Sequence, residues 1–206
     1  SIYSSANDLS RFVVAMLNGG RVDGRQVLPP LVVSRLPAKH TVMPGEGPPA
    51  HYGYGLLSFE DRGVRMVMHG GFSRGYGSMI QMAPEHRFAV IVQTNRSGET
   101  LSQTRAKAAE MFLPFKPPAA ESPKQSLPLS ASEAANFAGT YRNGPQTWDI
   151  ILKEGKLYYR QREGEHLLTR TGKHRLSFGE QLGGDLVFVA DTAGHIKYIF
   201  DGLYSA

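Results

Sequence analysis

The sequence predicts an α+β fold in which an antiparallel sheet flanked by helices is followed by a small antiparallel β-barrel. Helical apolar periodicity opens the chain and returns near residues 100–112, and strand-like runs lie between the two. Beyond a stretch rich in proline and serine, short alternating runs are separated by turn residues up to the last residue. Because each part has its own pattern, and 206 residues suffice for two cores, we expect two domains.

The domain boundary is expected in the segment FKPPAAESPKQSLPLSAS, residues 115–132. Proline, serine and alanine at this density are typical of an extended linker. The predicted organisation is a first domain over residues 1–117, a linker over 118–132 and a second domain over 133–206.

The first part begins with an amphipathic helix. Asn7 or Asp8 is expected to cap it, apolar residues recur with a period near 3.6 from Leu9 onward, and Asn18-Gly19-Gly20 ends it. The elements expected after it are a short helix over 31–36, strands over 51–59, 78–82 and 88–93, and a helix over 100–112.

The second part is expected to contain strands and no helix. Turn signals such as Glu154-Gly155, Gly172-Lys173 and Ala193-Gly194 punctuate it. The strands expected between them include 148–152, 157–161, 166–170 and 196–200. Regular hairpins of this kind favour a small antiparallel barrel or sandwich.

Composition excludes several kinds of chemistry. The chain has no cysteine, which rules out disulfides, thiolate nucleophiles and cysteine-ligated zinc. Its apolar runs are far shorter than the roughly 18 residues of a membrane span, and no signal peptide is expected in it. The net charge of +5 is scattered, so no nucleic-acid partner is expected. The histidines lack spacings such as H-E-x-x-H, so neither a metal nor a cofactor is expected.

One motif points to a nucleophile inside the chain. Gly71-Phe72-Ser73-Arg74-Gly75 matches G-x-S-x-G, the nucleophile elbow of α/β-hydrolases. That elbow requires a strand before the serine and a helix directly after it, whereas the residues from Tyr76 to Ile80 predict another strand. An elbow hydrolase using Ser73 therefore stays as an alternative and not as the main hypothesis.

A set of five segments, in a fixed order, carries a family resemblance. The segments are SSANDLSRF (4–12), LNGG (17–20), YGYGL (52–56), HGG (69–71) with Gly75, and VIVQTN (90–95). Together they resemble the C-terminal portion of the serine β-lactamase-related superfamily, in its branch of class C β-lactamases, D-alanyl-D-alanine carboxypeptidases and esterases. Gly139-Thr140-Tyr141-Arg142 resembles the opening of the lipocalin-like β-barrel that is often appended to these hydrolases.

The resemblance implies a catalytic role for one strand. His69-Gly70-Gly71 matches the family's H-x-G form of the K-T-G element, with His69 facing the substrate and Gly70 and Gly71 lining the cleft as substrate-binding residues. The backbone N–H of Phe72 would supply an oxyanion donor. A free imidazole is largely uncharged at neutral pH, so histidine in place of lysine weakens penicillin-type carboxylate recognition and leaves esterase and peptidase activities equally open.

Two elements of the family pattern are missing from the chain. No serine is followed three residues later by lysine, and Ser102-Gln103-Thr104-Arg105 comes nearest. Tyr141-Arg142-Asn143 spells Y-x-N and Arg170-Thr171-Gly172 mimics K-T-G, but both lie beyond the linker and are interpreted as coincidences.

The hypothesis is therefore the C-terminal portion of a bacterial serine hydrolase that cleaves amide or ester bonds of a small-molecule substrate through an acyl-enzyme. Its partner would be a missing N-terminal half that carries the nucleophile, and this chain alone is predicted to be inactive. Family resemblance favours a periplasmic or secreted location. A non-catalytic binding module for a cell-wall ligand or a protein partner remains the second alternative. Substrate and oligomeric state are not determined by these residues.

Overall fold

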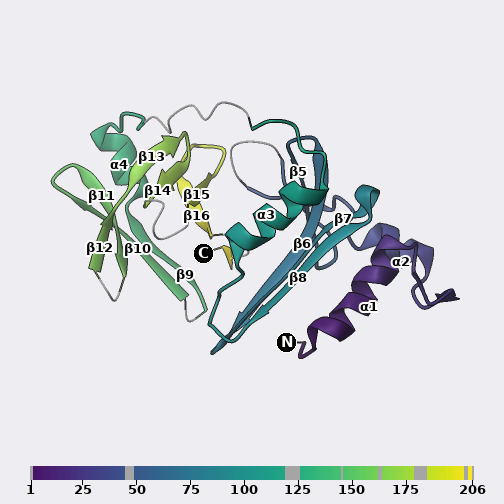
Figure 1. Cartoon of the computed structure of the whole chain (residues 1–206). Helices are drawn as coiled ribbons and strands as arrows, with labels where there is room; N and C mark the ends of the chain where they lie inside the picture. The colour runs from purple at the N-terminus through teal and green to yellow at the C-terminus, as the bar shows by residue number, and fades with distance from the viewer. Residues whose placement is uncertain are drawn as a thin grey trace. The chain divides into compact units, whose positions relative to one another are not determined.

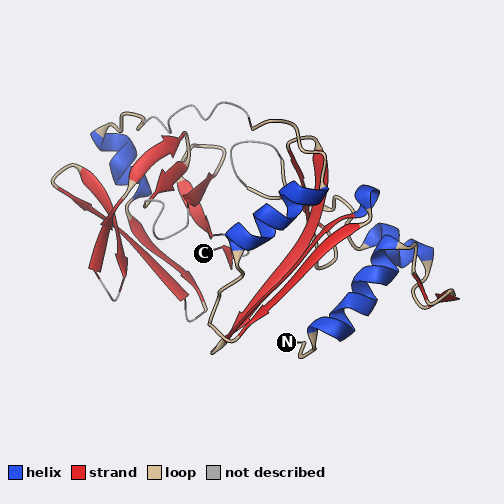
Figure 2. Ribbon diagram, in the orientation of Figure 1, coloured by secondary structure: helices blue, strands red, loops and turns tan. Residues whose placement is uncertain are grey.

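The structure is a computed structural model that describes residues 2–44, 49–118, 126–144, 146–161, 164–178, 185–201 and 204–205. The chain divides into two compact units. Among the described residues, the first unit contains 2–43 and 49–118, and the second contains those from Ser126 onward. Among the described residues, the first unit combines antiparallel strands with a few helices, and the second combines them with one short helix (Figures 1 and 2).

The first unit opens with helix α1 (Ala6–Leu17). Its N-cap is Ser5, whose hydroxyl oxygen accepts a hydrogen bond from the backbone N–H of Asp8 at 3.1 Å. The expected cap at Asn7 or Asp8 is therefore wrong by two or three residues, because the earlier serine already satisfies the first free N–H groups. The expected end is confirmed, since the C-cap is Asn18 and Gly19 and Gly20 both have positive φ.

A six-stranded antiparallel sheet with order β3-β4-β5-β6-β7-β8 forms the body of the first unit. Its strands are β3 (Thr41–Val42), β4 (His51–Tyr52), β5 (Leu57–Asp61), β6 (Val64–Ser73), β7 (Tyr76–Ala83) and β8 (Phe88–Thr94). The other elements are the β1 (Arg21–Val22) and β2 (Arg25–Gln26) hairpin, α2 (Pro30–Arg35), the 3₁₀ turn η1 (Pro84–His86) and α3 (Ser102–Phe112).

The sequence-based strand prediction was incomplete in this sheet. The single strand expected over 51–59 is two strands, because the chain turns at Gly53, where a Cβ atom would lie 2.2 Å from the carbonyl oxygen of Leu36. The apolar pattern did not predict strand β6, since its glycines resemble a loop, although the family resemblance placed His69-Gly70-Gly71 on a strand. Strand β6 follows a two-residue turn in which Arg62 and Gly63 both have positive φ, the requirement of a type I′ hairpin.

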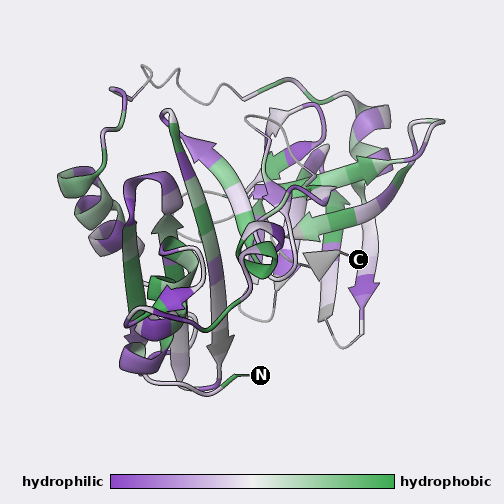
Figure 3. Cartoon of the chain, turned by 90° about the vertical axis from the view of Figure 1, so that its right-hand side faces the viewer, coloured by the Kyte–Doolittle hydropathy of each residue, from purple (hydrophilic) through white to green (hydrophobic). Residues whose placement is uncertain are grey.

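Helices cover both faces of the six-stranded sheet. Helix α1 lies on one face and α3 on the other (Figure 1). On the α1 face, Val67 and Met82 pack with Val13 and Met16 of the helix. On the α3 face, Val64, Met66 and Ala83 pack with Ala109 and Leu113. The middle of the sheet is thus buried from both sides, and Figure 3 shows hydrophobic stretches on strands and on helices.

The second unit consists of one short helix and two antiparallel sheets. The helix is α4 (Ala131–Phe137). One sheet has the order β12-β11-β10-β9, with β9 (Gly139–Asn143), β10 (Gln146–Lys153), β11 (Lys156–Gln161) and β12 (Gly164–Leu167). The other has the order β13-β14-β15-β16-β17, with β13 (Thr169–Gly172), β14 (Arg175–Ser177), β15 (Asp185–Ala190), β16 (Ile196–Asp201) and β17 (Tyr204–Ser205).

Two expectations about this unit were wrong. Helix α4 occupies the end of the expected linker and the start of the expected helix-free domain; it is stabilised by a capping box between Ser130 and Glu133. The single strand expected over 166–170 is split at Leu168, so that β12 and β13 belong to different sheets. Leu168 is buried, and turning there places both strands over one core.

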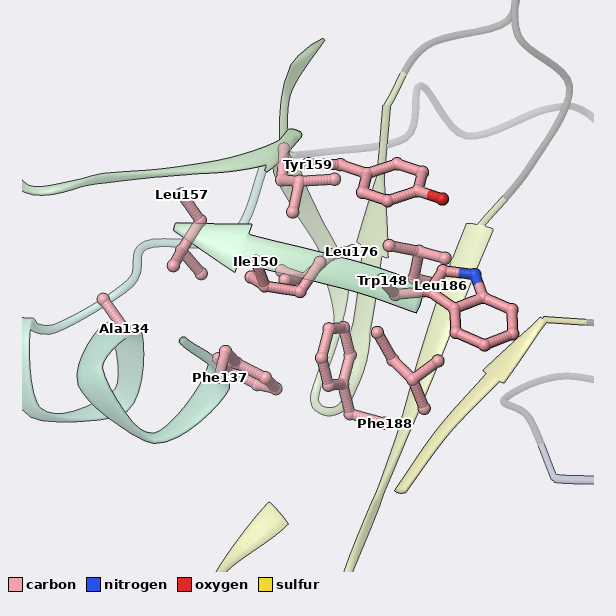
Figure 4. Packing of buried hydrophobic residues seen from close by; sticks show 11 residues of the cluster. Ala134, Phe137, Trp148, Ile150, Leu157, Tyr159, Leu176, Leu186 and Phe188 are labelled. Atoms are coloured by element: carbon pink, nitrogen blue, oxygen red, sulfur yellow. The ribbon is translucent and has the colours of Figure 1, made fainter. Parts of the chain in front are cut away.

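The core of the second unit lies between its two sheets. Trp148 and Ile150 of β10 point toward Leu186 and Phe188 of β15, and Phe137 of α4 closes the cluster (Figure 4). The observed class is therefore mixed α and β with antiparallel sheets and few helices. Closure of the two sheets into one barrel stays a prediction, and residues 119–125 of the expected linker lie outside the described residues.

Candidate active site

The stretch from His69 to Ser78 forms a β-hairpin. His69 pairs with Ile80, Gly71 with Ser78, and Ser73 with Tyr76, and the two-residue turn Arg74-Gly75 closes it, with Gly75 at φ 85°. Ser73 is consequently followed by strand β7 and not by a helix. The strand–turn–helix context that a nucleophile elbow requires is not formed at this serine.

Strand β6 runs past the end of its neighbour. Pairing between β5 and β6 stops at Leu57 and Met68, whereas β6 continues to Ser73. From His69 onward β6 is paired with β7 only, and no other described strand pairs with this segment. The last half of β6 therefore forms an open edge of the sheet.

The register decides which backbone groups reach this edge. In a two-residue hairpin, the residues on either side of the turn exchange backbone hydrogen bonds, and successive residues then alternate between the two sides of the strand. Ser73 and Tyr76 flank the turn, so His69, Gly71 and Ser73 direct their N–H and C=O groups toward β7. Gly70 and Phe72 must then direct theirs toward the open edge.

The side chains of the same segment alternate between the two faces. Val67 faces α1, so the period of two places His69 and Gly71 on that face as well, where both are exposed. Gly70 belongs to the α3 face, where a Cβ atom would lie 2.7 Å from the methyl carbon of Met79. The four predicted site residues thus contribute in two ways. Gly70 and Phe72 direct backbone groups toward the open edge, whereas His69 and Gly71 are exposed on the α1 face.

An exposed aromatic pair adjoins the start of the open edge. The turn between β4 and β5 immediately precedes Leu57, the residue at which pairing with β6 stops. Tyr54 in this turn is 64% exposed, and its ring centroid lies 4.2 Å from that of His40. Its backbone N–H donates to the carbonyl of Leu36 at 2.9 Å, which holds the turn in place. The sequence analysis placed this segment in an expected strand and in the family resemblance, but assigned it no role in the site.

The tip of the hairpin is held by residues 94–99, the last residue of β8 and the segment after it, which we call the brace. The N–H of Gly75 donates to the hydroxyl oxygen of Ser97 at 2.7 Å, and the Thr94 hydroxyl donates to the carbonyl of Glu99 at 2.8 Å. A Cβ atom at Gly77 would lie 2.1 Å from the carbonyl oxygen of Glu99. Only glycine permits this approach, so Gly77 and Ser97 position the hairpin; sequence reasoning did not identify either.

A family model matches most of the first unit. The model of the family described as Beta-lactamase matches residues 1–111, which include α1, the whole six-stranded sheet and most of α3. The chain belongs to the β-lactamase family. The predicted resemblance to the serine β-lactamase-related superfamily is thereby confirmed.

Curated relatives of this β-lactamase-family chain are D-aminopeptidases. The D-aminopeptidases of Brucella ovis and Brucella melitensis biotype 2 are each 26% identical to it over 194 residues. The matched region covers 76% of this chain and 37% of each relative. The chain therefore spans well under half the length of the curated relatives it matches.

Solved structures resemble the chain in fold. A crystal structure of SurE superposes with a TM-score of 0.65 at 20% identity, covering 94% of this chain and 46% of that one. A crystal structure of SurE with D-Leu superposes with a TM-score of 0.64 at 20% identity, covering 92% and 47%. At this identity the likeness concerns the fold alone.

The remaining sequence matches to β-lactamase-family motifs have structural roles. Tyr141, of the Y-x-N match, donates its hydroxyl to the carbonyl of Phe137 at 2.9 Å, and burial raises the pKa of Tyr141 to about 12. Arg170, of the K-T-G-like match, forms an ion pair with Glu133 at 3.0 Å and donates to three backbone carbonyls. Both side chains are committed to packing within the second unit.

No group of three or more His, Asp or Glu side chains in the described part of the chain is arranged to hold a metal ion. None of the helices in the described ranges has the length and apolar character needed to cross a bilayer.

Proposed function

We propose that this chain is the C-terminal portion of a serine hydrolase that cleaves amide or ester bonds through an acyl-enzyme. The observation that carries the proposal is the open edge of β6 from His69 to Ser73, in a chain that belongs to the β-lactamase family. An open strand edge offers free backbone donors and acceptors, which is how extended peptide-like ligands are bound by sheets.

The backbone of the open edge would supply most of the contacts to the substrate. The outward-directed N–H of Phe72 is suited to receive the negative charge that develops on the carbonyl oxygen of the substrate. Gly70, directed the same way, would align the substrate as an added strand. The lack of side chains at Gly70 and Gly71 allows a ligand to approach the strand closely.

His69 would act from the face of the sheet. Its side chain is exposed on the α1 face beside the bare surface of Gly71. From there the imidazole can donate a hydrogen bond to the leaving group or to a substrate carboxylate. Tyr54 and His40, at the start of the open edge, would supply an apolar wall for a substrate side chain.

The substrate class proposed is a small peptide or amide that contains a D-amino acid. Support comes from the relatives: they are named D-aminopeptidases, and one SurE structure holds D-Leu. An esterase activity is compatible with the same backbone geometry, because esters and amides pass through the same tetrahedral oxyanion.

The nucleophile would come from a part of the protein outside this chain. The chain contains no S-x-x-K element and spans 37% of the length of the relatives it matches. We therefore propose a missing N-terminal half as its partner, and a periplasmic or secreted location. Residues 1–117 would complete the catalytic domain and 133–206 would form the lipocalin-like barrel, with 118–132 between them.

The decisive experiment compares two substitutions in the full-length protein. His69→Ala is expected to lower kcat/KM on D-amino acid amides and nitrophenyl esters by about 10²- to 10⁴-fold, as for loss of a positioned acid–base or hydrogen-bonding group. Ser73→Ala, in the same hairpin, is the matched control and should change kcat/KM little. Circular dichroism would check that both variants fold.

Three results would contradict the proposal. Full activity of His69→Ala on every substrate would make His69 a structural residue. Turnover of a chromogenic cephalosporin or an ester by the 206-residue chain alone, abolished by Ser73→Ala, would favour the elbow hydrolase. A full-length protein without any acylable serine would favour the non-catalytic binding module.

A further inference from the structure

A small cavity lies on the α3 face of the first unit, on the opposite side of the sheet from His69. Its volume is about 120 Å³. Polar side chains from the β5–β6 turn, from β7 and from the start of α3 line much of it, and Phe115 closes one side. The residues that matter for its chemistry are Asp61, Arg62, Gln81, Ser102 and Arg105.

Arg105 has an unusual set of partners. Its Nε donates to the carbonyl of Thr100 at 2.8 Å, one terminal nitrogen donates to Oε1 of Gln81 at 2.5 Å, and the other to the hydroxyl of Thr100 at 3.4 Å. All three acceptors are neutral. No carboxylate of the described residues lies within ion-pair distance of this guanidinium, although the side chain is partly buried.

The other arginines that are partly buried among the described residues each have a carboxylate partner. Arg65 pairs with Glu85 at 2.9 Å, Arg170 with Glu133 at 3.0 Å, and Arg175 with Asp185 at 3.6 Å. Burial of a cation without a counter-charge costs free energy, and desolvation accordingly lowers the pKa of Arg105. Arg105 is therefore the exception that calls for an explanation.

The acids nearest the cavity are already engaged by Arg62. Its guanidinium lies 3.4 Å from Asp61 and 3.7 Å from Glu110, and it also stacks 4.2 Å over the ring of Phe115. Lys107 also lies 3.9 Å from Glu110, so Arg62 and Lys107 together balance these two carboxylates, and the positive charge of Arg105 is left over. The cavity combines this uncompensated guanidinium with the hydroxyl-bearing residue Ser102.

We propose that the cavity is a binding site for one small oxyanion, a carboxylate or a phosphate group, held by Arg105 and Ser102. The guanidinium fork matches the geometry of both groups, and its remaining N–H donors are available to them. A volume of about 120 Å³ accommodates a single group of this size and little more. This site is separate from the proposed active site and does not depend on the nucleophile.

The test is binding of inorganic phosphate and of acetate to the 206-residue chain, measured by thermal shift and titration calorimetry against chloride at matched ionic strength and pH. At least one of the two anions should stabilise the protein. Arg105→Gln should weaken that binding about tenfold or more, as for loss of a charged hydrogen bond. Arg35→Gln, at an exposed arginine of α2, is the matched control and should bind like the unaltered chain.

Two further variants test the proposal if Arg105→Gln does not fold. Arg105→Lys keeps the charge but loses the fork, and Ser102→Ala removes only the hydroxyl; both should weaken binding while the chain stays folded. Preference for phosphate or for acetate would identify which oxyanion the cavity takes. Absence of stabilisation by either anion, or equal binding by the Arg105 variants and Arg35→Gln, would overturn the proposal.

Discussion

The two units of this chain use antiparallel sheets in opposite ways. In the second unit, two sheets face each other and bury one large cluster that includes Trp148, Leu186 and Phe188. In the first unit, one sheet carries a separate cluster on each face, and β6 extends beyond its partner β5 to leave an open edge. An open edge can pair with another extended chain, and this property is the one on which the proposed binding role of β6 rests.

The comparison also shows where rigidity comes from. Packing between sheets holds the second unit, whereas the hairpin at the open edge is held by the brace, through Ser97 and the close approach of Glu99 to Gly77. The order of this exposed edge therefore depends on a few local contacts rather than on burial, and the edge stays accessible for the ligand that we propose.

The largest effect is expected from Phe188→Ala, which should destabilise the second unit by about 3–5 kcal/mol through the cavity it creates. Trp148 is the only tryptophan of the sequence, so its fluorescence follows this unit during urea unfolding. Circular dichroism should show that the transition of the first unit is unchanged. Phe112→Ala, at a side chain that is 70% exposed, is the control. If both transitions shift together, the two-domain assignment is wrong.

A smaller effect is expected from Gly77→Ala. The added methyl group would meet the backbone of Glu99, and such overpacking typically costs about 1–3 kcal/mol. Gly71→Ala makes the same chemical change in the paired strand, where the nearest atom is the Ser78 hydroxyl at 3.3 Å, so its effect on unfolding should stay within about 0.5 kcal/mol. Equal effects of the two substitutions would show that the brace does not hold the hairpin.

Ser97→Ala should lower the free energy of unfolding by about 1 kcal/mol, because it removes the acceptor of one neutral hydrogen bond donated by the N–H of Gly75. Hydrogen exchange at Gly75 and Tyr76 should accelerate while exchange in β5 is unchanged. Ser34→Ala, which removes a hydroxyl that bonds within α2, is the control. If hydrogen exchange at Gly75 and Tyr76 is unchanged, the turn itself holds the tip of the hairpin and the bond to Ser97 does not.

The smallest effect concerns the capping box of α4. Hydrogen bonds from the backbone N–H and the hydroxyl of Ser130, followed by Arg170, lower the pKa of Glu133 from 4.5 to about 2. The ionised Glu133 carboxylate therefore stabilises the folded state fully above pH 4.5, and this stabilisation is lost as the pH falls toward 2. Melting temperatures between pH 6 and 2 should show this loss in the unaltered chain and not in Glu133→Gln. The control Glu60→Gln, at an exposed side chain, should lose stability at low pH as the unaltered chain does. If the melting temperatures of the unaltered chain and of both variants fall in parallel with pH, Glu133 is not the group responsible.

The sequence by itself determined the local features of the fold. The C-terminal end of α1, the turn at Glu154-Gly155 and the alternation of β10 and β11 follow from residues close together in the chain, whose periodicity and turn chemistry act locally. The sequence also indicated the family, because short segments such as HGG and YGYGL occur along the chain in the order expected for that family.

Tertiary structure alone decided what those segments can do. The outward direction of Gly70 and Phe72 depends on where β5 stops pairing with β6, and the need for glycine at Gly77 depends on Glu99, twenty-two positions later. The split of 166–170 between two sheets and the unpaired charge of Arg105 are likewise set by distant partners. Strand pairing and charge balance are non-local, and a local pattern cannot specify which distant groups will meet.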